Sequence, residues 1–355
     1  MPPTNAYDPF VRGGAPVGVR TVEARDAARD RLFPCEIWYP AAPAHAGEDL
    51  AAETRDSFAV RSGDSLRSQD AVRNAAALPG AFPLILFSHP SGGHRRSATF
   101  LCTFLSSHGY VVAALDHSEV VSPELARRDC ETDAQKIARQ KAVVASRVPD
   151  IRFLLAHLLG GGAGDPDIGL DPARVGIVGH SLGGWTALAA TAVEPRIRAV
   201  VALAPGGSSR VKPGILPVTL DFRWGRDVPT LYLAAENDVS LPLDGMCELF
   251  ARAPETKQML ILRRADHLHF MDNVEEVHET VRTMPWTGEL DWIPKEMRPI
   301  AELCSGDQAH VFARGLTLGH MDATLRRQDE ARRFLAGDLA GELAARGVDA
   351  IVHEP

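Results

Sequence analysis

Residues 175–185 read Val175-Gly-Ile-Val-Gly-His-Ser181-Leu-Gly-Gly-Trp185 and contain a Gly-x-Ser-x-Gly pentapeptide centred on Ser181. The pentapeptide alone is weak evidence, and a glycine-rich turn without chemistry is the alternative. Its context is informative, because an apolar strand precedes it and a run suited to a helix follows it. A sharp turn between them requires small residues at Gly179 and Gly183, and it lifts the serine hydroxyl above the sheet. The stretch therefore predicts a strand, a tight turn with a nucleophilic serine, and a helix.

A second loop with glycines follows the first buried strand. Residues 83–88 are almost entirely apolar, as expected for a strand covered on both faces, and they lead into the loop 89–93. Acyl transfer to a serine requires two backbone N–H groups directed at the developing oxyanion. We expect one from Leu182, directly after the nucleophile, and the other from Ser91. The proline before Ser91 has no N–H, so Gly92 is the alternative donor.

A carboxylate that could orient the catalytic base follows a later strand. Residues 230–235 form an apolar run that ends in Glu236-Asn237-Asp238. Asp238 lies just past the strand end, where a carboxylate can hold an imidazole, whereas Glu236 is on or beside the strand. Asp221 and Asp227 precede the strand and are weaker candidates. We therefore assign the acid to Asp238.

The histidine of such a site comes last in the chain. His267 lies in the loop after the strand at 258–263 and follows Asp238 by 29 residues (267 − 238), enough for one helix and one strand. It would accept the serine proton and return it to the leaving alcohol. His269 and His320 are the rival bases. His267, His269 and Asp272 also permit a metal-site interpretation, but no second cluster completes one, so no metal is expected.

Short apolar runs alternate with longer helical patterns, which is typical of a mainly parallel sheet with helices on both faces. We expect one domain over residues 1–355, of α/β class. The predicted strands are 17–22, 33–39, 83–88, 110–115, 175–179, 196–204, 230–235 and 258–263. The first two are expected to pair antiparallel at the sheet edge. The predicted helices are 96–108, 134–159, the one opened by Ser181, 322–335 and 338–346.

Two stretches interrupt this rhythm. Residues 41–80 are rich in Ala, Gly, Asp and Ser and are expected to form a surface excursion or partly mobile loop. Residues 271–315 are expected to be an insertion that forms a lid over the active site. Trp286 and Trp292 within it, together with His180 beside the nucleophile, are candidates for contact with substrate, because aromatic rings offer large apolar contact area.

The combined motifs resemble a known family. Residues 83–93, 105–117, 179–184 and His267-x-x-Phe270 look like platelet-activating-factor acetylhydrolases and their bacterial relatives, which are often grouped with dienelactone-hydrolase-like esterases of the α/β-hydrolase fold. The likeness covers roughly residues 10–270. It implies a lipase-like serine esterase with a Ser-His-Asp triad, no cofactor, and oxyanion donors at Ser91 and Leu182.

The sequence also departs from these families. The acetylhydrolases carry their acid soon after the strand that follows the nucleophile helix, but here that strand ends in Ala202-Leu-Ala-Pro205, without a carboxylate. Dienelactone hydrolases use a cysteine nucleophile, where this chain has Ser181. His89-Pro90 replaces the more usual His-Gly of the oxyanion loop. These differences argue against a specificity of the phospholipid type.

Composition excludes some functions and favours others. The formal net charge is −8, from 46 acidic and 38 basic residues, which argues against sequence-independent binding of nucleic acid. The first residues lack the basic and apolar regions of a signal peptide, so we expect none there, and no apolar run is long enough for a membrane span. Five widely spaced cysteines without a Cys-x-x-Cys fit reduced thiols in the cytoplasm. They are Cys35, Cys102, Cys130, Cys247 and Cys304.

We therefore predict a carboxylic-ester hydrolase that forms an acyl-enzyme intermediate and acts on small or medium acyl or aryl esters. The partner is a small-molecule ester, and the chain is a monomer or homodimer. An acyltransferase with the same triad and a phospholipase A2-like acetylhydrolase are the alternatives. Amidase or lactonase activity, or a catalytically silent binding protein of the same fold, would also be compatible with the pattern.

Overall fold

A computed structural model gives the structure, which describes residues 7–60, 64–128, 131–160, 167–254 and 256–353. Its strands are β1 (Val17–Asp26), β2 (Arg31–Pro40), β3 (Ser57–Phe58), β4 (Arg67–Ser68), β5 (Val72–Arg73), β6 (Phe82–Ser88), β7 (Val111–Leu115), β8 (Leu170–His180), β9 (Ile197–Leu203), β10 (Thr230–Ala235), β11 (Lys257–Leu262) and β12 (Ala350–His353). Its α-helices are α1 (Thr99–Ser107), α2 (Ser118–Val121), α3 (Asp133–Leu159), α4 (Leu182–Val193), α5 (Leu243–Arg252), α6 (Val274–Thr283), α7 (Ile293–Glu296), α8 (Gly306–Thr324), α9 (Asp329–Leu335) and α10 (Leu339–Ala344). The 3-10 turns are η1 (Pro43–His45), η2 (Pro123–Leu125), η3 (His267–Phe270), η4 (Gly288–Leu290) and η5 (Ile300–Glu302).

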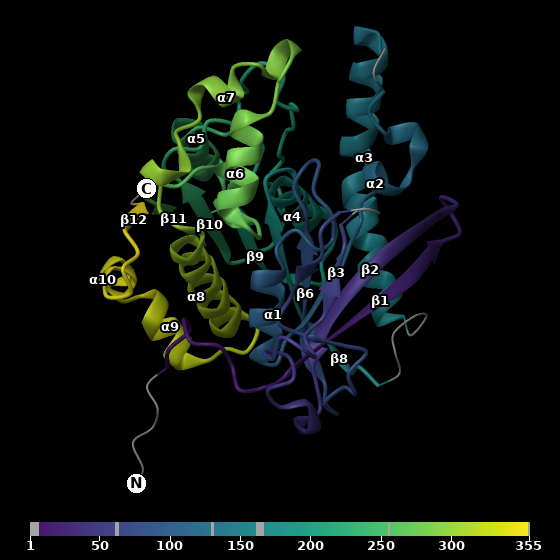
Figure 1. Cartoon of the computed structure of the whole chain (residues 1–355), viewed down its shortest axis with the longest axis vertical. Helices are drawn as coiled ribbons and strands as arrows, with labels where there is room; N and C mark the ends of the chain where they lie inside the picture. Colours follow the sequence, from purple (N-terminus) through teal and green to yellow (C-terminus); the bar gives the residue numbers. More distant parts are fainter. Residues whose placement is uncertain (1–6, 61–63, 129–130, 161–166, 255, 354–355) are drawn as a thin grey trace.

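A mixed sheet forms the centre of the molecule (Figure 1). Its strand order is β12-β11-β10-β9-β8-β6-β7-β2-β1-β5. The strands from β7 to β11 pair in parallel, whereas β1 with β2, β2 with β7, and β11 with β12 are antiparallel. The sequence prediction of a mainly parallel sheet with an antiparallel pair near one edge is therefore confirmed.

Helices cover both faces of this sheet, because the central strands are apolar on both sides. On β6, Leu84 and Leu86 belong to the apolar cluster beneath α3, α4 and α5, whereas Ile85 and Phe87 belong to the cluster beneath α1 and α8. Figure 1 shows α1 and α8 in front of the sheet and α4 and α5 behind it. The period-2 alternation of a strand thus divides the core into two layers.

The strand order brings two distant loops together. The chain passes from β6 to β7 on one side and then returns to β8 on the other, so β6 and β8 are neighbours. Ser88 at the end of β6 pairs in register with Gly179 on β8. In an open parallel sheet this reversal point is where ligands bind, at the carboxyl ends of the strands. The start of the loop 89–93 and Ser181 therefore lie side by side at this end of the sheet.

The segment 41–80 is tied to the body more than the sequence suggested. Its strand β5 pairs with β1 and extends the sheet, and β3 pairs with β4. A few of its polar side chains are buried, among them Asp49 and Gln69, and the Trp38 indole N–H donates to Gln69 Oε1 over 2.7 Å. The low apolar content of this segment gave no sign in the sequence that buried hydrogen bonds hold it to the body of the protein. Residues 61–63 lie outside the described part.

The C-terminal third also differs from the prediction. The expected helix 322–335 is two helices, since α8 ends at Thr324 and α9 begins at Asp329. The predicted insertion 271–315 includes the first half of α8, where Phe312 and Ala313 are fully buried. The short edge strand β12 was not predicted. No helix in the described part of the chain has the length and apolarity that a membrane crossing requires.

Candidate active site

The turn between β8 and α4 has the strained backbone expected of a nucleophile elbow. Ser181 adopts φ 59° and ψ −120°, a conformation that costs of order 1–3 kcal/mol for a residue with a side chain. Close packing around it excludes other residues at the flanking glycines. A Cβ on Gly179 would lie 2.0 Å from the carbonyl oxygen of Gly183, and one on Gly183 would lie 1.9 Å from that of Ser88. The elbow is therefore compressed against the end of β6.

Three predicted residues meet at this turn. His267 Nε2 lies 2.8 Å from Ser181 Oγ, and His267 Nδ1 lies 2.6 Å from Asp238 Oδ2. The other oxygen of Asp238 accepts hydrogen bonds from the backbone N–H groups of Ser240 (2.9 Å) and Leu241 (2.7 Å). These contacts fix the carboxylate so that it holds His267 with Nδ1 protonated and Nε2 directed at the serine.

The electrostatics favour a histidine that gains a proton readily. Burial acts to lower the pKa of His267, but the charge and hydrogen bond of Asp238, with a smaller contribution from Asp266, outweigh it and raise the pKa above 6.5. Burial and the nearby Asp238 charge raise the pKa of Asp266 to about 7. Of these two carboxyl groups, Asp238 is the one in direct contact with the imidazole.

Two backbone N–H groups of residues that line the cavity beside the serine have no hydrogen-bond partner among the described residues. Neither the N–H of Leu182, at the first position of α4, nor that of Ser91 hydrogen-bonds to another residue in the described ranges. Both residues line one cavity together with Ser181 and His267. In the loop 89–93, Gly93 N–H donates to Pro90 O over 3.1 Å and Gly92 has φ +73°, as in a type II turn.

The cavity that contains Ser181 and His267 has a volume of about 560 Å³. One wall comes from α2, η2 and α3, and the other from the loop after β9 and from the segment after α6. Most of its lining is apolar: Leu125, Val143, Leu182, Ile215, Leu216, Val218, Val239, Leu241, Leu268, Val281, Trp286, Leu290, Ile293 and Met297. Polar groups include Glu119, Arg127, Arg139 and Gln140. Such a lining suits an apolar ligand with a few polar atoms.

The three residues expected to contact substrate have different positions. Trp286 lines the cavity, and its indole N–H donates to Val281 O over 2.7 Å. Trp292 is outside the set of lining residues: its N–H donates to Pro213 O, and Lys212 Nζ lies 3.9 Å from the ring centroid. His180 is buried behind His267, with 4.8 Å between the two ring centroids, and is outside that set too. Trp292 thus joins two loops of one wall, and His180 supports the base.

The rival residues have other partners. His269 is fully buried and contacts Cys304 O, and His320 on α8 contacts Pro229 O. Glu236 accepts a hydrogen bond from the N–H of Arg264. Asp221 pairs with Arg223 at the surface. None of these four side chains contacts Ser181 within the part of the chain that the structure describes.

The metal-site interpretation finds no support in the geometry. Asp272 does not approach the two histidines but caps helix α1, accepting from the N–H groups of Thr99 (2.7 Å) and Phe100 (2.9 Å). The described residues contain no group of three or more His, Cys, Asp or Glu side chains placed to hold a metal ion.

The wall residues of the loop 206–218 were missed by sequence reasoning. This stretch has neither helical nor strand periodicity, so nothing in the sequence connected it to the site. It lies there because β9 ends next to β8, which directs the following loop over Ser181. Leu125 and Val143 were missed for a similar reason, since each is an ordinary apolar residue whose position depends on how α3 packs.

Comparison with known proteins gives a family and a fold. The model of a family described as PET hydrolase-like matches residues 93–313, more than half of the chain. A platelet-activating factor acetylhydrolase from Cavia porcellus is 25% identical over 219 residues, which cover 54% of this chain and 48% of that protein. The cutinase est1 of Thermobifida alba is 24% identical over 224 residues, covering 62% of this chain and 64% of the relative. The chain therefore spans about half to just under two thirds of these relatives.

A solved structure matches almost the whole chain. It is a ferulic acid esterase from Streptomyces cinnamoneus, with a TM-score of 0.68, 22% identity, and coverage of 96% of this chain and 97% of the other. At this identity the likeness demonstrates the α/β-hydrolase fold.

Proposed function

This chain belongs to the PET hydrolase-like family, and on that basis we propose that it is a carboxylic-ester hydrolase with Ser181 as its nucleophile. The observation that carries the proposal is the chain of contacts from Ser181 Oγ to His267 Nε2 (2.8 Å) and from His267 Nδ1 to Asp238 Oδ2 (2.6 Å). The names of the relatives, an acetylhydrolase, a cutinase and a ferulic acid esterase, agree with this reaction class.

In the first half-reaction, Ser181 Oγ attacks the carbonyl carbon of the ester while His267 Nε2 takes the hydroxyl proton. The carbonyl oxygen becomes negative in the tetrahedral intermediate and is stabilised by the N–H groups of Ser91 and Leu182. When the intermediate collapses, His267 gives the proton to the departing alkoxide oxygen. An alcohol leaves, and the acyl group remains on Ser181.

In the second half-reaction, a water molecule takes the place of the alcohol. His267 removes one of its protons as the water attacks the acyl carbon, and then returns the proton to Ser181 Oγ as the acid leaves. Asp238 stays ionised and keeps the ring in the productive tautomer. In each half-reaction His267 acts first as a base and then as an acid, and an imidazole can do both because it readily gains and loses a proton.

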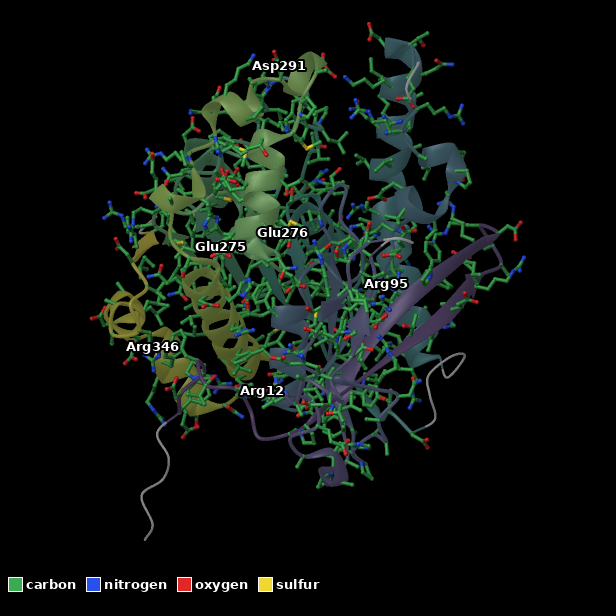
Figure 2. The ribbon with its side chains drawn as sticks, viewed as in Figure 1. Arg12, Arg95, Glu275, Glu276, Asp291 and Arg346 are labelled. Atoms are coloured by element: carbon green, nitrogen blue, oxygen red, sulfur yellow. The ribbon has the colours of Figure 1, made fainter. Side chains whose placement is uncertain are left out.

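The cavity supports small or medium acyl or aryl esters as substrates. Its volume of about 560 Å³ and its apolar lining accommodate an aromatic ring or a short aliphatic chain beside Ser181. Trp286, from the segment 271–315, contributes an aromatic surface to this lining. We propose that this segment acts as the roof of the acyl pocket. Glu275, near the start of this segment, and Asp291, near its middle, are labelled in Figure 2.

A panel of p-nitrophenyl esters from acetate to palmitate, run beside an aromatic diester, tests this function. Wild-type protein should hydrolyse the shorter esters or the aromatic diester, and Ser181→Ala should not. Adding an acceptor alcohol distinguishes the hydrolase from the alternative, an acyltransferase. If transfer of the acyl group to the alcohol is faster than release of the free acid, the chain is an acyltransferase. If folded wild-type protein hydrolysed none of these esters, the proposal would be rejected.

A further inference from the structure

A fully buried arginine lies behind the loop that carries Ser91. Arg147 on α3 has 0% relative exposure, and its Nη1 donates to the carbonyl oxygen of His89 over 2.6 Å. Its Nη2 makes a longer contact of 3.4 Å with the carbonyl oxygen of Pro90 and also pairs with Glu119. The guanidinium therefore contacts two consecutive carbonyl groups immediately before Ser91.

The position of the Pro90 carbonyl determines the direction of the Ser91 N–H. The two groups belong to the same peptide unit, which is planar and trans, so they point in opposite directions. Donors that hold the carbonyl on the protein side therefore direct the Ser91 N–H to the other side. That side is the cavity, because Ser91 lines it together with Ser181 and Leu182.

Other donors converge on the same carbonyl. His89 Nδ1 lies 2.8 Å from Pro90 O, and the ring's Nε2 accepts from the backbone N–H of His117 over 3.0 Å. One nitrogen therefore donates and the other accepts, which requires a neutral ring. Burial and the nearby Arg147 charge lower the pKa of His89 and so favour that form. The N–H of Gly93 is the third donor.

A buried hydrogen-bond network of Ser88, His117 and Asp150 adjoins these donors. His117 Nδ1 lies 3.1 Å from Asp150 Oδ2, and its Nε2 lies 2.8 Å from Ser88 Oγ. This is a second Ser-His-Asp arrangement, but Ser88, His117 and Asp150 are each 0% exposed. Its serine cannot reach a substrate. The arrangement instead holds the start of the oxyanion loop on the end of β6.

We propose that Arg147 is a positioning residue that orients the Ser91 N–H toward the oxyanion, with Glu119 balancing its charge. The proposal rests on the proposed ester hydrolysis, since it assigns a role within that reaction. Arg147 touches neither substrate nor reacting atoms. Its effect must therefore appear in the transition state, where the oxyanion exists, rather than in the binding of the uncharged ester.

The test compares Arg147→Met and Arg147→Lys with wild type and with a matched control, Arg226→Met. Arg226 also donates to backbone carbonyls, those of Thr191, Glu194 and Ile197, but lies away from the oxyanion loop. For each protein, kcat and KM are measured with a p-nitrophenyl ester, Ki with an alkyl trifluoromethyl ketone, and Tm by thermal melting. The ketone forms an anionic tetrahedral adduct with the serine and so reports on the oxyanion site.

We expect Arg147→Met to lower kcat by about 10²-fold, the usual effect of losing one oxyanion donor, with KM nearly unchanged. The Ki of the ketone should rise by a similar factor. Arg147→Lys, which keeps the charge opposite Glu119 but can hold only one carbonyl well, should show a smaller loss of the same kind. Arg226→Met should lower Tm and leave kcat and Ki at wild-type values.

Three results would overturn the proposal. The first is near-wild-type kcat in a folded Arg147 variant. The second is a rise in KM as large as the rise in the Ki of the ketone, which would indicate general distortion of the cavity. The third is the same kinetic pattern in Arg226→Met. If Arg147→Met does not fold, Arg147→Lys decides. If folded wild type hydrolyses no ester, the proposed function itself fails and this assignment fails with it.

Discussion

At the scale of single residues, the site depends on one histidine held between a serine and a carboxylate. The side chain of Asp238 is 1% exposed and that of His267 is 12% exposed, so the pair is screened from water while the serine faces the cavity. Low solvent access strengthens the attraction between imidazolium and carboxylate. The geometry thus suits the positive charge that His267 would acquire in the proposed reaction of Ser181.

Asp238→Asn tests this arrangement. We expect kcat to fall by about 10⁴-fold, because an amide N–H opposite Nδ1 favours the wrong tautomer. The carboxylate also raises the pKa of His267 above 6.5. Activity requires the neutral ring and rises with pH through that pKa, so the acid limb of kcat/KM should move to lower pH in the variant. Glu236→Gln is the control. If it, or Asp221→Asn, were the more damaging change, the acid would be misassigned.

The sequence predicted that the three residues of the proposed triad would lie near one another, because each follows a strand. In a parallel sheet, the ends of neighbouring strands meet at one edge, so residues 181, 238 and 267 were expected to be near one another. The role of His180 could not be read in the same way. Its position in the motif is adjacent to the nucleophile, yet its side chain turns to the opposite side, as alternate residues of a strand do. Arg147 carried no signal, because its function depends on tertiary packing.

At the scale of elements, the elbow between β8 and α4 is held against the end of β6. Gly183→Ala should therefore be costly, since its Cβ would lie 1.9 Å from the backbone carbonyl oxygen of Ser88. We expect a loss of about 1–3 kcal/mol in the free energy of unfolding, together with reduced activity, because relief of the clash separates the elbow from the oxyanion loop. Urea unfolding and ester hydrolysis measure the two effects. Gly14→Ala, where an added Cβ has open space, is the control. Equal stability of the two variants would contradict the packing argument.

The two tryptophans of the segment 271–315 should differ. Trp286 lines the cavity, so Trp286→Ala should change the ranking of acyl chain lengths with little change in Tm. Trp292 joins its segment to the loop at Pro213, so Trp292→Ala should lower Tm and keep the wild-type ranking. An ester panel combined with thermal melting separates the two effects. If both variants lowered Tm and kept the ranking, the segment would have only a structural role.

The elements that the sequence did not predict correctly were missed for different physical reasons. Helix α8 begins with a capping box, in which Ser305 and Gln308 satisfy each other's backbone N–H groups. This Ser-x-x-Gln signal was present in the sequence, but the tryptophans and prolines before it made the whole stretch look like an insertion. Strand β12 has only four residues and adds to an edge, and such short segments have no distinct period. The loop 206–218 has no distinct period either.

At the scale of the whole molecule, buried neutral histidines make stability depend on pH. Burial lowers the pKa of His269 and of His320 to about 4. The unfolded chain binds these protons from about pH 6.5 downward, whereas the folded chain does not until about pH 4. The free energy of unfolding should therefore decrease as pH falls through this window, by about 1.4 kcal/mol per pH unit for each such histidine. His267, with its raised pKa, acts in the opposite direction.

Urea unfolding at pH 7, 6 and 5 checks this expectation. His320→Asn, which keeps a donor for Pro229 O but cannot titrate, should reduce the pH dependence by roughly one histidine's share, about 1.4 kcal/mol per pH unit. Stability that did not change between pH 7 and pH 5, or a variant with the wild-type slope, would show that these histidines are not neutral in the folded protein.

The central claim is that Ser181 carries the acyl group, and trapping that intermediate tests it most directly. Wild-type protein is mixed rapidly with a p-nitrophenyl ester, quenched in acid, and analysed by mass spectrometry after digestion. We predict a burst of p-nitrophenol of about one per chain where deacylation is the slower step, and an acyl group on the peptide that contains Ser181. Ser181→Ala should give neither. An acyl group on another residue, or ester hydrolysis by a folded Ser181→Ala at more than a few per cent of the wild-type rate, would contradict the account.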